Sequence, residues 1–481
     1  MFFNLRTQRA RLILVLSVVI FLTSFFLYTY KLSSSFTYHT DIARDADEMT
    51  QLAQGDFTLI GPRLNLGGFH AGPYYYYLFA PILLLSSFDL DFVLIFNALL
   101  FSLALIYLFK KVSEKYSLIW ALFSSAVFMI LPLYHLVSRN PGNAYTYMPL
   151  LLIFLTHVYF NNVYKKVEFL TLGLLAGIIT NFHPLNILVF MPIFLYLFFS
   201  AKKKADTLFL LLGVIITYLP LLIFELTHNF VIIKKMAYSF SIGELPLSPK
   251  GENVSTSSLL DNYLNSQRVV REFILFSPFV YLILFALSLV KFLKIKSSDK
   301  LLFFTFGSLV SFILYAVAFR GDIGPHYVFP FAFFMFFSLW LLLLSNNIRF
   351  FALIIILVEI MVFNTSLYET SGRPKEKFEE AVDFTLQEKL VTKDDSFNII
   401  QSVEKVPAGH EYRFFYRARG YKPKSINAYD SSNILLVFDD RDDYRIEDLR
   451  NWETSQFGQE YLNNYEKYST GKVKIYKFSK I

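Results

Sequence analysis

Long apolar blocks separated by short charged connections constrain this sequence more than any other feature. Of its 481 residues, 55% are hydrophobic and only 17% are charged. A single soluble core does not accommodate so many apolar blocks. Blocks close to 20 residues long have the length of a membrane-spanning helix. The sequence therefore predicts a polytopic α-helical membrane protein.

The charged residues follow the pattern of membrane topology. The net charge is +7, and lysines gather in short connections between the apolar blocks, as at residues 202–204. Such clusters are typical of cytoplasmic loops, so the expected partner of these charges is the lipid bilayer and not a nucleic acid. The sequence has no cysteine, which excludes disulfides, thiolate metal sites and a cysteine nucleophile.

The positive-inside rule selects one arrangement of spans. Arg6, Arg9 and Arg11 precede an apolar run at 12–30, which we interpret as a retained anchor with a cytoplasmic N-terminus. The run Tyr74–Ser87 is short for a span, and we expect an interfacial or re-entrant helix there. If Tyr74–Ser87 does not cross the bilayer, the positive-inside rule gives about eleven spans and a C-terminus outside the cytoplasm. After the anchor, the spans are expected near 90–109, 117–135, 145–161, 168–182, 184–200, 206–226, 272–292, 301–319, 326–345 and 348–365.

The composition changes near residue 370. From there the chain is charged, and its apolar residues alternate as in half-buried strands. The expected elements are a helix at Lys375–Leu390 and strands at Phe397–Gln401, Ile434–Phe438 and Lys472–Phe478.

We therefore expect two domains. Residues 1–369 would form the transmembrane domain, with a first outer loop and juxtamembrane helices at 31–89. Residues 370–481 would form a small extracytoplasmic α/β domain.

A polar, acidic region follows the anchor at Thr37–Tyr77. In a helix over 41–54, Asp41, Arg44, Asp45 and Glu48 lie on one face, because their spacing is i, i+3, i+4, i+7. Carboxylates beside an arginine near a bilayer are costly unless they bind something, and we interpret this region as the active site.

Structural explanations of the same residues stay open. Asp41 is also a suitable N-cap for a helix over 42–54. Asp45 is also a suitable ion-pair partner for Arg44. Asp47 and Glu48 are expected on a solvated face.

Other polar connections fall on the predicted outer side. They are rich in His, Arg, Asn and Pro, which bind anions or hold irregular backbone. These connections are residues 135–145, 181–184, 227–271 and 320–327.

Taken together, these residues resemble the GT-C membrane glycosyltransferases. The similarity is to the bacterial family-39-like group related to protein O-mannosyltransferases and the lipid A aminoarabinose transferase, and it covers roughly residues 1–365. Many of these relatives carry an adjacent Asp-Glu pair, whereas Asp41 is followed by Ile42. The matching motifs are Asp41-x-x-Arg44-Asp45, Gln54-Gly55-Asp56-Phe57, Gly72-Pro73 with Tyr74–Leu78, Ser138-Arg139-Asn140-Pro141, and His326-Tyr327 with Pro330.

The resemblance implies a GT-C fold and a sugar transfer on the outer face of the plasma membrane. The donor would be a polyprenyl-phosphate-linked sugar, and the acceptor a hydroxyl of an envelope lipid, glycan or protein. The implied catalytic residues are Asp41 and Asp45, either of which could act as the base. The implied substrate-binding residues are Arg44, His70, Tyr74, Arg139, Asn140, His183, His326 and Tyr327.

Other functions stay open at this point. The pattern requires no cofactor, although a divalent metal at the acidic residues is compatible with it. A multi-span transporter or flippase of lipid-linked substrates would place ionisable residues at mid-bilayer, often in paired repeats. The predicted spans are nearly free of charge and show no repeat, which favours the enzyme. A non-catalytic assembly protein would leave the acidic region unexplained.

The lysine distribution generates a first prediction. A reporter that is active only outside the cytoplasm, fused after Ile481, should give signal. A reporter active only in the cytoplasm, fused at the same place, is the control. A cytoplasmic C-terminus would contradict both the predicted topology and the predicted location of the acidic region.

Overall fold

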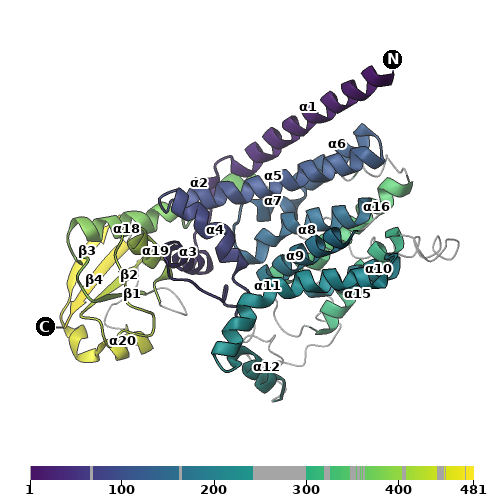
Figure 1. The fold of residues 1–481 in the computed structure, drawn as a ribbon. Coiled ribbons are helices and arrows are strands. Elements are labelled where there is room, and N and C mark those ends of the chain that lie inside the picture. The colour runs from purple at the N-terminus through teal and green to yellow at the C-terminus, as the bar shows by residue number, and fades with distance from the viewer. Residues whose placement is uncertain are drawn as a thin grey trace. The chain divides into compact units, whose positions relative to one another are not determined.

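The chain is mostly helical, with a small four-stranded sheet near its C-terminus. Figure 1 shows the computed structural model. It describes residues 2–64, 69–161, 165–241, 300–318, 325–346, 365–402, 408–440, 451–471 and 473–480, together with residues 354, 358, 360, 363 and 449. Two compact units are present, and each contains segments that are distant in sequence.

Unit 1 comprises Met1–Tyr30, Thr58–Tyr75 and Leu94–Leu367. Its helices are built from runs of Leu, Phe and Ile. They are α1 (Phe2–Thr29), α5 (Leu90–Lys115), α6 (Leu118–Ile130), α7 (Pro132–Ser138), α8 (Asn143–Phe160), α9 (Lys166–Phe182), α10 (Asn186–Ser200), α11 (Leu208–Thr227), α12 (Val231–Ser241), α15 (Lys300–Ala318) and α16 (Phe329–Asn346), with short 3₁₀ helices η1 (Lys204–Thr207), η2 (Pro325–Tyr327) and η3 (Thr365–Tyr368).

Long apolar helices are present, as the sequence predicts. Among the described residues, three helices are long and apolar enough to cross a membrane: Gln8–Thr29, Leu90–Lys115 and Lys204–Thr227. A fourth span results if α6 and α7 are counted as one. The finer prediction of about eleven spans stays a prediction. The expected span at 272–292 lies outside the described residues, as does most of the one at 348–365.

The expected span at 117–135 is not one straight helix. Its two parts, α6 and α7, meet at an angle of 62°. The break falls at Leu131, directly before Pro132 at the start of α7. Proline has no N–H to donate and disfavours helical backbone in the residue before it, which explains the break.

Helices α9 and α11 approach each other through glycines. A Cβ atom added to Gly173 would lie 2.1 Å from the Leu210 carbonyl oxygen, and one added to Gly177 would lie 1.9 Å from Thr217 Oγ1. A Cβ on Gly213 would lie 2.5 Å from the Leu170 carbonyl oxygen. Small residues allow helix backbones to pack this closely, as is common among membrane helices.

This contact generates a second prediction. Gly173→Ala should destabilise the chain by about 1–3 kcal/mol, because the new methyl group meets backbone and α9 and α11 must separate. Gly372→Ala is the matched control, since a Cβ there meets nothing within 4 Å. Thermal unfolding in detergent measures both. Equal melting temperatures for the two variants would contradict the close packing.

Unit 2 comprises Lys31–Phe57, Tyr76–Val93 and Tyr368–Ile481. Helix α4 begins in unit 1 and continues into unit 2 at Tyr76. The helices of unit 2 are α2 (Leu32–Ser35), α3 (Thr40–Ala53), α4 (Tyr74–Leu85), α18 (Lys375–Gln387), α19 (His410–Ala418) and α20 (Trp452–Phe457), with the 3₁₀ helix η5 (Gln459–Asn463).

The sheet of unit 2 has the strand order β1-β2-β4-β3. Strand β1 (Phe397–Gln401) is parallel to β2 (Ile434–Asp439), and β4 (Val473–Ser479) is antiparallel to both β2 and β3 (Glu466–Thr470). The predictions of a helix from Lys375 and of strands β1, β2 and β4 are confirmed. Strand β3 was not predicted, because it is polar and mostly exposed.

Unit 2 contains more of the chain than the tail predicted as a separate domain. Helix α3 lies beside α19 (Figure 1). Residues 31–57 and 76–93, which were expected in the membrane domain, therefore belong to the same compact unit as the tail.

Helix α4 is short, as expected for Tyr74–Ser87. It has 12 residues and contains Pro81. At a rise of 1.5 Å per residue it is about 18 Å long, whereas the hydrocarbon core of a bilayer is about 30 Å thick. Its location at an interface stays a prediction.

Candidate active site

Helix α3 carries the predicted catalytic residues. It begins at Thr40, and His39 occupies the N-cap position without a side-chain cap hydrogen bond. Asp41 is therefore not the N-cap that the structural alternative requires. It lies in the first turn, where a negative charge interacts favourably with the helix dipole.

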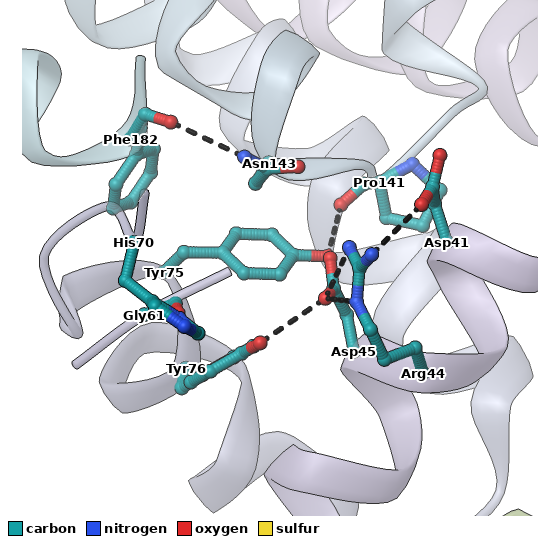
Figure 2. Close-up of polar contacts among 10 residues, drawn as sticks. All are labelled: Asp41, Arg44, Asp45, Gly61, His70, Tyr75, Tyr76, Pro141, Asn143 and Phe182. Carbon is teal, nitrogen blue, oxygen red and sulfur yellow. Dashed lines mark hydrogen bonds and ion pairs between the residues drawn. The ribbon is translucent and has the colours of Figure 1, made fainter. Parts of the chain in front are cut away.

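Asp41, Arg44 and Asp45 are in direct contact (Figure 2). Arg44 Nη1 lies 2.9 Å from Asp41 Oδ1, and Arg44 Nη2 lies 3.0 Å from Asp45 Oδ1. The exposed fractions of the side chains are 53% for Asp41, 20% for Arg44 and 1% for Asp45. One arginine thus links an exposed carboxylate to a buried one.

Tyr76 completes the surroundings of Asp45. Its hydroxyl donates a hydrogen bond of 3.1 Å to Asp45 Oδ1, the oxygen that also accepts from Arg44 (Figure 2). Tyr76 belongs to the run Tyr74–Ser87, for which only an interfacial or re-entrant helix was expected, and its contact with Asp45 was not predicted. Its only signal was that α4 follows α3 closely in the chain.

Burial and neighbouring charges act on these groups in opposite directions. Burial raises the pKa of the Asp45 carboxyl to about 6, although the Arg44 charge and the hydrogen bonds from Arg44 and Tyr76 oppose this rise. Burial alone would lower the pKa of Arg44, but Asp45, Tyr76 and Asp41 together raise it. Arg44 therefore keeps its charge, and the pKa of Asp45 lies above the ordinary value of a carboxyl.

The expectation that Asp47 lies on a solvated face is wrong. Its side chain is buried, and Asp47 Oδ1 lies 2.6 Å from Arg417 Nε on α19. Asp47 follows Asp45 by two positions, which turns it to the opposite face of the helix. Glu48 is exposed, as expected. No local pattern could have revealed Arg417 as the partner, because it is far away in the sequence.

Arg139 and Asn140, from the predicted substrate-binding set, lie in unit 1. Arg139 Nη1 donates to the carbonyl oxygens of Leu27 and Tyr28, at the end of α1, at 3.2 and 3.1 Å. The Asn140 side chain accepts a hydrogen bond of 3.0 Å from the Gly142 N–H. These contacts stabilise a helix end and a turn. Their predicted role in substrate binding stays a prediction.

His70 and Tyr74 also lie in unit 1. His70 Nδ1 is 3.1 Å from the Gly61 carbonyl oxygen in the same loop (Figure 2), and its predicted role in substrate binding stays a prediction. Tyr74 is the first residue of α4. Next to it, the Tyr75 hydroxyl donates a hydrogen bond of 2.6 Å to the Pro141 carbonyl oxygen.

His183 lies beside His326 and Tyr327 in unit 1, although it is distant from both in sequence. The ring centroid of His183 is 6.3 Å from that of His326 and 5.6 Å from that of Tyr327. Tyr147, which the sequence analysis missed, is 5.7 Å from His183. Of the predicted substrate-binding residues, Arg44 lies in unit 2 and the other seven lie in unit 1.

A metal at these residues was left open by the sequence. In the part of the chain that the structure describes, no three or more His, Asp or Glu side chains are grouped so that they could hold a metal ion.

Comparison with models of known protein families finds no match, and comparison with curated proteins finds none either.

The raised pKa of Asp45 generates a third prediction. In the unfolded chain this carboxyl has a pKa near 4, so the folded state binds the extra proton between about pH 4 and pH 6. The wild-type chain should therefore lose up to about 3 kcal/mol of stability relative to Asp45→Asn as the pH rises through this window.

Melting temperatures of both proteins in detergent, at about pH 4 and about pH 7.5, measure this effect. Asp394→Asn is the control, because Asp394 is exposed. A difference between Asp45→Asn and wild type that is the same at both pH values would contradict the raised pKa.

Proposed function

We propose that this chain is a membrane glycosyltransferase. It would transfer a sugar from a polyprenyl-phosphate donor to a hydroxyl of an envelope lipid, glycan or protein, on the outer face of the membrane. The observation that carries the proposal is the arrangement on α3, where Arg44 is held between an exposed and a buried carboxylate. This arrangement follows α1, a helix long and apolar enough to act as a membrane anchor.

Asp41 is the base in this proposal. Its side chain is 53% exposed, so an acceptor hydroxyl can reach it, whereas Asp45 is 1% exposed. The acceptor oxygen attacks the anomeric carbon, and its proton passes to the Asp41 carboxylate. The new glycosidic C–O bond forms as the bond from the anomeric carbon to the phosphate oxygen breaks. The polyprenyl phosphate leaves as an anion.

Arg44 would stabilise that leaving phosphate. Negative charge grows on the phosphate oxygen in the transition state, and a preoriented cation lowers the energy of this state. The buried Asp45 and the Tyr76 hydroxyl fix the orientation of Arg44 through Asp45 Oδ1. Asp45 thus acts as a positioning residue in this reaction.

Other features support an enzyme over a transporter. The charged cluster lies on the polar helix α3 and not on an apolar helix of membrane length. A transporter would concentrate such groups at the middle of its spans. The predicted topology of about eleven spans places α3 outside.

The proposal generates a fourth prediction. Asp41→Asn keeps the size of the side chain and an oxygen for Arg44, but it cannot accept the proton. Turnover should fall about 100-fold or more. Asp45→Asn should reduce turnover less, since it changes only the orientation of Arg44. Asp394→Asn, at an exposed carboxylate, is the matched control.

Two measurements test the proposal. Mass spectrometry of envelope glycans and glycoproteins, from cells with and without the gene, identifies the product and the acceptor. Release of polyprenyl phosphate by the purified chain in lipid nanodiscs then gives the turnover of each variant. No change in glycans, together with no release from any lipid-linked sugar, would refute the proposed function.

A further inference from the structure

Helix α3 has two polar faces, and only one of them belongs to the candidate active site. Asp41, Arg44 and Asp45 form the first face. The second face carries Thr40 and Asp47, seven positions apart, and Gln54 follows Asp47 by seven. Residues seven apart lie on one side of a helix. This second face contacts the C-terminal part of unit 2 at three levels.

The segment that leads into α3 is the first level. The Tyr38 N–H donates a hydrogen bond of 2.9 Å to the Arg373 carbonyl oxygen, and the Ser371 N–H donates one of 2.9 Å to the Ser34 carbonyl oxygen. The buried Tyr38 ring packs against Phe378 and Phe415, at centroid distances of 5.5 and 5.6 Å. The entry to the helix is therefore fixed by residues of the tail.

The first turn of α3 is the second level. Thr40 Oγ1 donates a hydrogen bond of 2.9 Å to Glu411 Oε1, and Arg373 Nη2 lies 3.0 Å from the same oxygen. Glu411 is 1% exposed. It is the second residue of α19, so the start of α19 is joined to the start of α3, beside Asp41.

The middle and the end of α3 are the third level. Arg417 pairs with the buried Asp47 at 2.6 Å, and its carbonyl oxygen accepts a hydrogen bond of 3.2 Å from Gln54 Nε2. Burial raises the pKa of the Asp47 carboxyl, and the positive charges of Arg417 and Arg413 partly offset this rise. A buried carboxylate without its cation is strongly unfavourable, so this pair constrains α3 along its length.

We propose that the C-terminal part of unit 2 is a positioning element for the catalytic helix, with Arg417 and Glu411 as positioning residues. It holds α3 from the face opposite Asp45 and thereby sets where Asp41 and Arg44 point. This inference rests on the proposed function for its catalytic meaning. The docking of α3 itself does not depend on which reaction the chain performs.

The experiment compares Arg417, in the last turn of α19, with Arg419, the C-cap residue of the same helix. Arg417→Met removes the partner of Asp47 on α3. Arg419→Met is the matched control, because Arg419 contacts Asp383 and Glu379 on α18 and the Phe415 carbonyl oxygen, and none of its contacts within the described residues is with α3. A double variant, Asp47→Asn with Arg417→Met, removes both charges of the buried pair and should recover much of what the single variant loses.

Hydrogen exchange of the full chain in nanodiscs is the first readout. In Arg417→Met, peptides covering residues 40–53 should exchange at least about tenfold faster, because the unpaired carboxylate favours release of α3. Peptides of β1, β2 and β4 should keep their wild-type rates, which shows that the tail is folded. Unchanged exchange in Arg417→Met, or equally fast exchange of residues 40–53 in Arg419→Met, would overturn the inference.

Turnover is the second readout. Arg417→Met should lower kcat by at least about tenfold, since small misplacements of catalytic groups are costly. The KM for the lipid-linked donor should change little, the double variant should recover kcat, and Arg419→Met should match wild type. If exchange responds as expected but the wild-type chain transfers no sugar, the proposed function fails and the docking of α3 stands. If exchange responds and kcat does not, the positioning role is wrong.

Discussion

The buried ion pair between Asp47 and Arg417 is the interaction on which the geometry of the candidate site depends. Taking both charges out of water is costly, and the cost is offset only while the two groups stay together. Around this pair, Thr40 and Gln54 bind the same tail segment near the two ends of α3. A helix of 14 residues is only marginally stable alone in water. Contacts with the tail therefore supply much of its stability.

The opposite face of α3 uses electrostatics differently. There Asp45 is buried with Arg44 and Tyr76, while Asp41 stays exposed and shares the same arginine. Two carboxylates with different surroundings have different tasks available to them: the exposed one can exchange a proton with a ligand, and the buried one can orient a cation. One face of this short helix therefore carries the candidate site, and the opposite face carries the contact with Arg417.

Local features of this molecule could be predicted from the sequence, and long-range ones could not. The apolar blocks, the start of α18 and strands β1, β2 and β4 leave a periodic pattern within a few residues. The predicted start of α3 was one residue from the observed one. Asp47 was misjudged because its burial depends on Arg417, and Tyr76 was missed because its hydroxyl meets Asp45 only after α3 and α4 pack. Such contacts are set by tertiary packing, which produces no periodic pattern in the local sequence.

The assembly of unit 2 from three chain segments has a consequence for biosynthesis. Gln54 and the Arg417 carbonyl that it contacts are 363 residues apart. At typical elongation rates, the ribosome needs roughly 20–70 seconds to make the intervening chain. During this interval α3 has been made but the segment that stabilises it has not. Until Arg417 has been made, this acidic helix therefore lacks the partner of Asp47 and Gln54 in unit 2.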